Sequence, residues 1–197
     1  MKIKIGLAAF FAAMAAYLVY QLGGQEAIGR LGLTFGSDCK VKQPLSAAPV
    51  LAEMVAISEA NAKGWKADSV VVDILQSKLR PDGSAEYTRL TSYSASGKAT
   101  MNISFSGGNL RCETNRSEPD PHAATAPNDF LRDGAALYKI AQAHGQALID
   151  KGYTIETRYW IPDTKWIVEL HKEGGTPQAL NIDVDARTGA FRTVRAD

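Results

Sequence analysis

The sequence contains few of the residues that most often carry catalysis or metal binding. Its 197 residues include only three histidines and two cysteines. The cysteines, Cys39 and Cys112, lie far apart and form no C-x-x-C pair, so the common zinc-site signatures are absent. The motif G-x-S-x-G, which places a nucleophilic serine on a strained turn, is absent as well. We therefore expect neither an enzyme nor a cofactor nor a metal centre.

The chain also lacks an excess of charge of one sign. It has 22 basic and 21 acidic residues, which gives a formal net charge of +1. Such a chain has no long-range field that would attract nucleic acid, so we expect no nucleic-acid partner. Its 45% hydrophobic and 22% charged content is that of an ordinary globular protein and argues against disorder.

Charge is missing altogether from residues 5–25. A helix of this length is roughly 32 Å long at about 1.5 Å per residue, and about 20 apolar residues suffice to span a bilayer. Lys2 and Lys4 precede the run, which is typical of an export signal whose lysines stay in the cytoplasm. We expect an uncleaved anchor in the bacterial inner membrane, with the remainder facing the periplasm. The alternative is a signal peptide cleaved after the A-x-A site at residues 13–15, which would give a secreted or periplasmic product.

Either alternative places the two cysteines where thiols can oxidise. We therefore predict a disulfide between Cys39 and Cys112, with two unpaired buried thiols as the alternative. The bond would close a loop of about 74 residues, and the chain-entropy model gives such a loop about 4–4.5 kcal/mol of stabilisation.

The pattern after the apolar segment divides into four parts. Residues 26–48 form a tether without sustained periodicity, and residues 49–115 form a first folded unit. Residues 116–129, rich in proline and small polar residues, form a linker, and residues 130–197 form a second unit. Each unit is expected to contain one helix followed by four strands in a meander, so the fold class is α+β with two tandem antiparallel units. The two sheets either pack together or form one continuous sheet.

Several residues mark the elements within each unit. In the first unit we expect a helix that begins at Pro49, buries Leu51, Met54, Val55 and Ser58, and ends at Lys63-Gly64. The following strand is expected to place Val70, Val72 and Ile74 on one side.

In the second unit we expect Asp129 as the helix N-cap, a stripe that includes a packed structural His144, and a C-terminal stop at Lys151-Gly152. The last two strands should form a hairpin around residues 187–189, with Gly189 at a position of positive φ.

The second unit resembles a PepSY-type domain. The resemblance rests on a helix ending in "KG", a hairpin, and the pattern "W.VEL......L.IDVDA.TG". The matching residues here are Lys151, Gly152, Trp166, Val168, Leu170, Ile182, Val184, Asp185, Thr188 and Gly189. The tandem arrangement on an exported chain also resembles, more loosely, that of beta-lactamase inhibitor proteins, whose sheet presents a concave face to the target. These resemblances imply extracytoplasmic binding or inhibition of proteases and other enzymes, or a regulatory module.

One face of the second sheet is the candidate binding surface. Strand alternation directs Ile155, Thr157, Tyr159 and Trp166 inward, so the outward set comprises Glu156, Arg158, Trp160, Glu169 and His171. The alternative is a face whose mixed charge only meets water, as is usual for an antiparallel sheet. An exposed tryptophan beside an arginine is instead the composition of an interface anchor. Glu169, His171 and Asp183 carry groups that suit a metal, but no spacing fixes a third ligand, and we assign no metal.

The sequence therefore favours a protein-binding module whose partner is another envelope or secreted protein, as an inhibitor or an assembly partner. A sensor domain that binds a small ligand or a metal through the same face is the second hypothesis. A hydrolase with an unrecognised site is the third.

Overall fold

The computed structural model describes residues 39, 46, 48–117, 129–172 and 179–196. The predicted anchor, most of the tether and most of the linker lie outside these ranges, whereas the two predicted folded units fall largely inside them. Within the same ranges, no helix is both long and apolar enough to cross a membrane.

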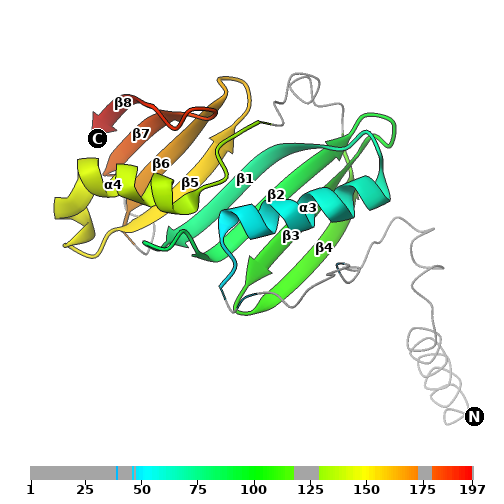
Figure 1. Ribbon diagram of the computed structural model, residues 1–197, viewed down its shortest axis with the longest axis horizontal. Coiled ribbons are helices and arrows are strands. Elements are labelled where there is room, and N and C mark those ends of the chain that lie inside the picture. Colours follow the sequence, from blue (N-terminus) through cyan, green and yellow to red (C-terminus); the bar gives the residue numbers. More distant parts are fainter. Residues whose placement is uncertain (1–38, 40–45, 47, 118–128, 173–178, 197) are drawn as a thin grey trace, which may run out of the picture. The chain divides into compact units, whose positions relative to one another are not determined.

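Each unit consists of one helix and four strands, as the sequence predicts (Figure 1). The first unit comprises α3 (Leu51–Trp65), β1 (Val70–Leu79), β2 (Ala85–Ser94), β3 (Ala99–Ser106) and β4 (Asn109–Arg116). The second comprises α4 (Gly134–Ile149), β5 (Thr154–Trp160), β6 (Lys165–His171), β7 (Leu180–Asp185) and β8 (Phe191–Ala196).

The two units share one antiparallel sheet of eight strands, in the order β4-β3-β2-β1-β5-β6-β7-β8. The first strands of the units join them, with register from Ile74 opposite Tyr159 to Ser77 opposite Glu156. This pairing answers the question that the sequence left open. Because β1 and β5 occupy equivalent places in their units and run antiparallel, a twofold rotation about the sheet normal relates the halves. Both helices therefore lie on the same face of the sheet (Figure 1).

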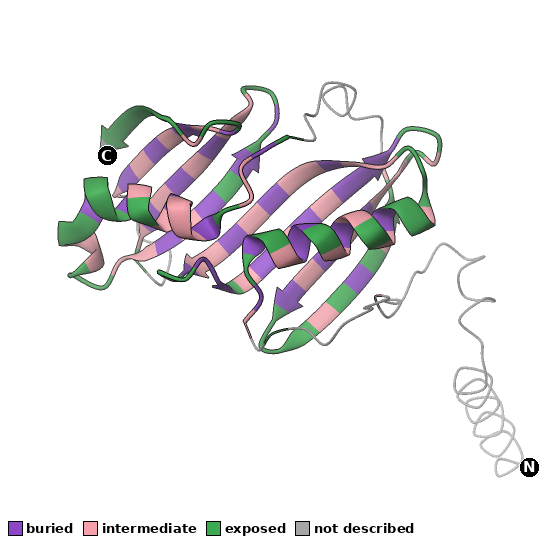
Figure 2. Ribbon diagram, in the orientation of Figure 1, coloured by how far each residue is buried: buried purple, intermediate pink, exposed green. Residues whose placement is uncertain are grey.

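The core lies between this face and the two helices. The predicted face of α3 is confirmed, since Leu51, Met54, Val55 and Ser58 are all fully buried. The predicted inward residues of β5 and β6 are confirmed too, and Trp166 has no exposed surface. Figure 2 shows the resulting alternation of buried and more exposed positions along the strands. Buried residues from both units form a single cluster, so the halves share one core.

The predicted alternation of inward and outward residues is wrong at the start of β1. Val71 and Ile74 are buried, whereas Val70 and Val72 are only partly so. The cause is a β-bulge: Val71 pairs with Ser92 but Asp73 pairs with the adjacent Thr91, which leaves Val72 as an extra residue. The extra residue reverses the alternation and places Asp73 on the face away from the helices.

Both the predicted end of α3 and the predicted start of α4 need correction. The N-cap of α4 is Asp133, whose side chain accepts a hydrogen bond from the Ala136 N–H at 3.1 Å, and not Asp129. Asp129 instead forms an ion pair with Arg187 at 3.4 Å. The helix α3 continues through Gly64 and ends at Trp65, so glycine does not stop it.

His144 is not a packed core residue. The backbone of α4 departs from helical geometry at Gly145, which is buried against Leu170. This kink gives the inward position to Gly145 and leaves His144 exposed, stacked on Phe191 with ring centroids 4.4 Å apart.

The disulfide between Cys39 and Cys112 is present, with Cα atoms 5.2 Å apart. Cys112 is buried opposite Ile103, so the bond lies on the helix-covered face of β4. A disulfide that packs into the core indicates an oxidising, extracytoplasmic compartment.

Candidate functional site

One face of the eight-stranded sheet carries no helix among the described elements. Its side chains come from every strand of both units and are largely polar, with partial exposure that contrasts with the buried residues between them. All five predicted binding residues lie on this helix-free face, on β5 and β6. Their part in binding remains a prediction, but the structure brings them together as the alternation indicated.

At the centre of the helix-free face, Asp73 joins the two units. Its carboxylate accepts hydrogen bonds from Arg89 Nη2 of β2 at 2.9 Å and from Arg158 Nε of β5 at 3.1 Å. The side chain of Asp73 is only 18% exposed, and those of Arg89 and Arg158 are 37% and 47% exposed. The carboxylate between two guanidinium groups fixes the direction of both arginines across the junction of the halves.

Trp160 extends this cluster. The Arg158 guanidinium lies over the Trp160 ring at 5.4 Å from the centroid, and 38% of the tryptophan is exposed. Contact with the cation restricts the ring before any partner arrives, at a contribution of about 0.5–1 kcal/mol for an exposed pair. We call Asp73, Arg89, Arg158 and Trp160 the junction cluster. Sequence reasoning missed Asp73 and Arg89, because only the bulge and the β1–β5 pairing bring them beside Arg158.

The remaining predicted residues form an acidic corner next to this cluster. Glu156 and Glu169 face each other across β5 and β6, and His171 Nε2 lies 4.0 Å from the nearer oxygen of Glu156. Asp183, the third donor considered for a metal, is engaged by Lys165 at 2.9 Å. Within the described ranges, no group of three or more potential ligands is arranged around a metal position.

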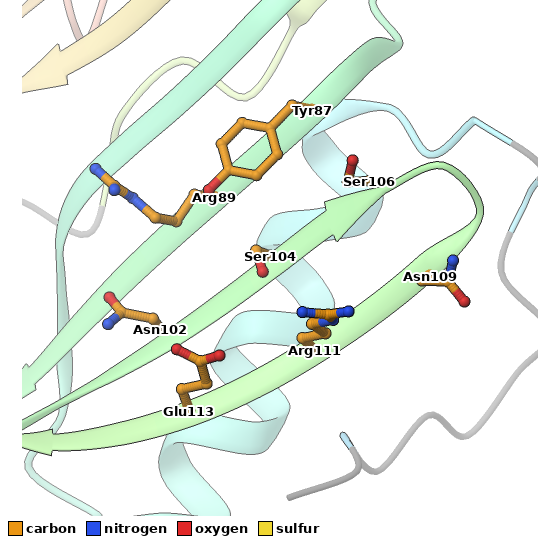
Figure 3. Close-up of a pocket in the computed structure, with 8 residues that line it drawn as sticks. All are labelled: Tyr87, Arg89, Asn102, Ser104, Ser106, Asn109, Arg111 and Glu113. Atoms are coloured by element: carbon orange, nitrogen blue, oxygen red, sulfur yellow. The ribbon is translucent and has the colours of Figure 1, made fainter. Parts of the chain in front are cut away.

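A polar hollow of about 510 Å³ lies on the same face over β2, β3 and β4 (Figure 3). Every residue that lines it is polar or aromatic: Tyr87, Arg89, Asn102, Ser104, Ser106, Asn109, Arg111 and Glu113. Sequence reasoning placed no site in the first unit, since each of these residues is an ordinary polar strand residue by itself. These residues form a recognisable polar site only when the register of β2, β3 and β4 places them side by side.

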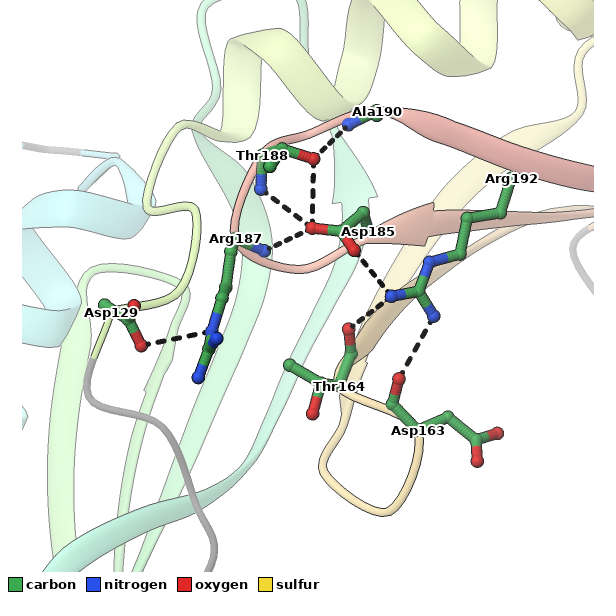
Figure 4. Close-up of polar contacts among 8 residues, drawn as sticks. All are labelled: Asp129, Asp163, Thr164, Asp185, Arg187, Thr188, Ala190 and Arg192. Carbon is green, nitrogen blue, oxygen red and sulfur yellow. Dashed lines mark hydrogen bonds and ion pairs between the residues drawn. The ribbon is translucent and has the colours of Figure 1, made fainter.

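The motif that carries the PepSY resemblance builds a turn. The Asp185 carboxylate accepts hydrogen bonds from the N–H groups of Arg187 and Thr188 and from the Thr188 hydroxyl, and it pairs with Arg192 (Figure 4). These donors, the Thr188 N–H first and the Arg192 guanidinium second, hold the pKa of Asp185 far below its usual range. Gly189 has the predicted positive φ of 72°. These residues therefore have a structural role in the terminal hairpin.

Comparison with protein-family models, with curated proteins and with solved structures found no match to this chain. The PepSY-type resemblance therefore remains a hypothesis from sequence. A function can be inferred only from the geometry of the helix-free face.

Proposed function

We propose that this chain is an extracytoplasmic module that binds another envelope or secreted protein through the helix-free face. The observation that carries the proposal is the junction cluster. It places a partly exposed tryptophan and two oriented arginines at the centre of the sheet face that no described element covers. Tryptophan and arginine are the residues most enriched among interface positions that dominate binding energy.

Two further features support a binding role. The acidic corner and the junction cluster lie side by side on β5, so the surface offers neighbouring patches of opposite charge. Such a pattern favours specificity and orientation of a partner over raw affinity. The core disulfide suits a module that works in an oxidising compartment, and the predicted anchor at residues 5–25 would hold it at the membrane.

Site-specific photo-crosslinking in intact cells tests the proposal. A photoreactive amino acid at Ile167, beside Arg158 on the helix-free face, should give one discrete adduct with a partner protein. The matched control is Gln146, which is exposed on α4 on the other face, and it should give none. In the Ile167 background, Trp160→Ala should weaken capture by roughly thirtyfold, since a buried aromatic anchor costs about 2 kcal/mol on truncation. Equal adducts from both faces, or an adduct insensitive to Trp160→Ala, would contradict the proposal.

A further inference from the structure

The polar hollow is a grid of side chains that the sheet register fixes. Ser104 of β3 lies opposite Arg89 of β2 on one side and Arg111 of β4 on the other. In the next row along the strands, Ser106 lies between Tyr87 and Asn109. Neighbouring strands are about 4.8 Å apart and alternate residues on one strand about 6.7 Å apart, so the rows present polar groups at regular short intervals.

The groups in this grid differ from those elsewhere on the helix-free face. Both arginines of the junction cluster are paired with Asp73, and Asp183 is likewise held by Lys165. Within the hollow, Arg89 is held by Asp73, whereas Arg111 and Glu113 form no ion pair with any residue that the structure describes. Both side chains remain available to a ligand, and Figure 3 shows them next to each other on β4.

Donors and acceptors alternate around the hollow. Asn102 uses its oxygen to accept from Thr91 at 2.7 Å, which leaves its amide N–H groups as donors. Asn109 uses its amide nitrogen to donate to the Gly107 carbonyl at 3.2 Å, which leaves its oxygen as an acceptor. Arg111 only donates, the Glu113 carboxylate only accepts, and the serine hydroxyls do both. A complementary ligand must therefore carry groups that donate and accept at closely spaced positions.

This pattern decides between classes of ligand. Phosphates and carboxylates only accept, and Glu113 would repel them. Aliphatic and aromatic ligands would find no apolar wall, which small-molecule pockets usually provide. A sugar ring matches the grid, because each hydroxyl both donates and accepts and the hydroxyls stand on adjacent carbons. Figure 3 shows the flat face of the Tyr87 ring turned outward over β2, where the C–H side of a pyranose can rest on it.

We propose that the polar hollow binds a neutral oligosaccharide, with Tyr87 as the stacking surface and Arg111 and Glu113 as the hydrogen-bonding pair. The volume of about 510 Å³ lies within the range of about 300–1,000 Å³ that is typical of ligand sites. The hollow shares Arg89 with the junction cluster, but none of the three residues assigned to stacking and hydrogen bonding belongs to that cluster, so the proposal does not depend on the protein-binding function.

Saturation-transfer NMR on the full chain tests this assignment. The probes are cellotriose, triacetylchitotriose and, as an anion that only accepts hydrogen bonds, tricarballylate, each at roughly ten times a Kd of about 1 mM. At least one trisaccharide should receive saturation at its ring protons, and tricarballylate should receive none. Tyr87→Ala, which removes the stacking ring, and Glu113→Gln, which removes the acceptor's charge, should each weaken binding about tenfold, or about 1.4 kcal/mol.

Two matched variants complete the experiment. Glu86→Gln alters a glutamate of β2 that pairs with Lys78 outside the hollow, and it should leave saccharide binding unchanged. Trp160→Ala should weaken partner capture by the same factor of roughly thirty and leave saccharide binding intact, so the two proposals can fail separately. Co-sedimentation with insoluble cellulose or chitin would show that the glycan is a polymer chain, whereas binding of the trimer alone would indicate a free oligosaccharide. Saturation of neither trisaccharide, saturation of tricarballylate alone, or binding unaffected by Tyr87→Ala and Glu113→Gln would overturn the assignment.

Discussion

Arg158 of the second unit donates a hydrogen bond to Asp73 of the first, with 3.1 Å between Nε and Oδ1. The same carboxylate holds Arg89, so Asp73→Asn weakens two charge-assisted contacts at once. We expect a loss of about 1 kcal/mol of unfolding free energy in urea, at the upper end of partly exposed ion pairs. Glu86→Gln, which breaks the more exposed pair with Lys78, should change stability by less than about 0.5 kcal/mol. If the two variants lose equal amounts of unfolding free energy, the contacts of Asp73 between the units contribute no more to stability than an exposed ion pair does.

Trp160 and Trp166 lie on opposite faces of the β5–β6 hairpin and should respond in opposite ways to truncation. Trp166 is fully buried beside Tyr159, so Trp166→Ala should cost about 3–5 kcal/mol of stability. Trp160 is 38% exposed, and Trp160→Ala should cost about 1 kcal/mol or less while it weakens partner capture. Urea denaturation of both variants measures the difference. A larger loss for Trp160→Ala would contradict the assignment of the faces.

Gly134, at the start of α4, packs directly on the turn between β1 and β2. A Cβ atom at this position would lie 2.6 Å from the Gly83 carbonyl oxygen, a contact between two backbones that cannot easily move apart. Gly134→Ala should therefore destabilise the protein by about 1–3 kcal/mol, despite the better helix propensity of alanine. Gly64→Ala in α3 is the control, because nothing lies within 4 Å of its added Cβ, and it should be neutral or stabilise by up to about 1 kcal/mol. Thermal unfolding measures both variants, and a higher melting temperature for Gly134→Ala than for Gly64→Ala would contradict this packing.

Reduction of the Cys39–Cys112 disulfide should lower stability without changing the fold. The bond joins residues 73 positions apart, and the chain-entropy model predicts a loss of up to about 4.5 kcal/mol on reduction. Urea unfolding with and without a phosphine reductant measures the loss. The Cys39→Ser/Cys112→Ser double variant should have the same unfolding free energy as the reduced protein, and the reductant should not change it. A peptide map of the unreduced protein that shows two separately alkylated thiols would contradict the bond itself.

Acid should destabilise the protein through the carboxylates that hold turns. Hydrogen bonds, chiefly from the Ser96 N–H and the Ser94 hydroxyl, lower the pKa of Asp68 to about 2, and the pKa of Asp185 is lowered further by the donors of the terminal turn. A pKa that is lower in the folded state gives stability that is fully present above the ordinary value of 3.8 and is lost as pH falls below it. Unfolding free energy should therefore decrease from about pH 4 to pH 2. The Asp185→Asn variant should have a lower unfolding free energy at neutral pH and should lose less of it on acidification. If its unfolding free energy runs parallel to that of the unsubstituted protein between about pH 7 and pH 2, Asp185 does not have this role.

The local pattern was predictable because strand alternation and helical periodicity are properties of neighbouring residues. The inward set Ile155, Thr157 and Tyr159, the buried Trp166 and the Gly189 turn all follow from spacing within one or two elements. The α4 N-cap was not predictable in this way. Asp129 and Asp133 are the same residue type four positions apart, and long-range contacts keep the residues between them out of the helix, since Phe130 is buried against Tyr159 and the Leu131 N–H donates to the Ala186 carbonyl.

The sequence by itself determined the two helix-plus-four-strand units, the cysteine pair and the five outward residues of β5 and β6. Only the tertiary structure decided how the units join, because the β1–β5 pairing depends on backbone hydrogen bonds between distant segments, such as Ile74 and Tyr159. Only the tertiary structure also placed Asp73 on the helix-free face, since a bulge at Val72 depends on the register with β2. The junction cluster and the polar hollow arise from these long-range registers, which bring together side chains that are ordinary within their own strands.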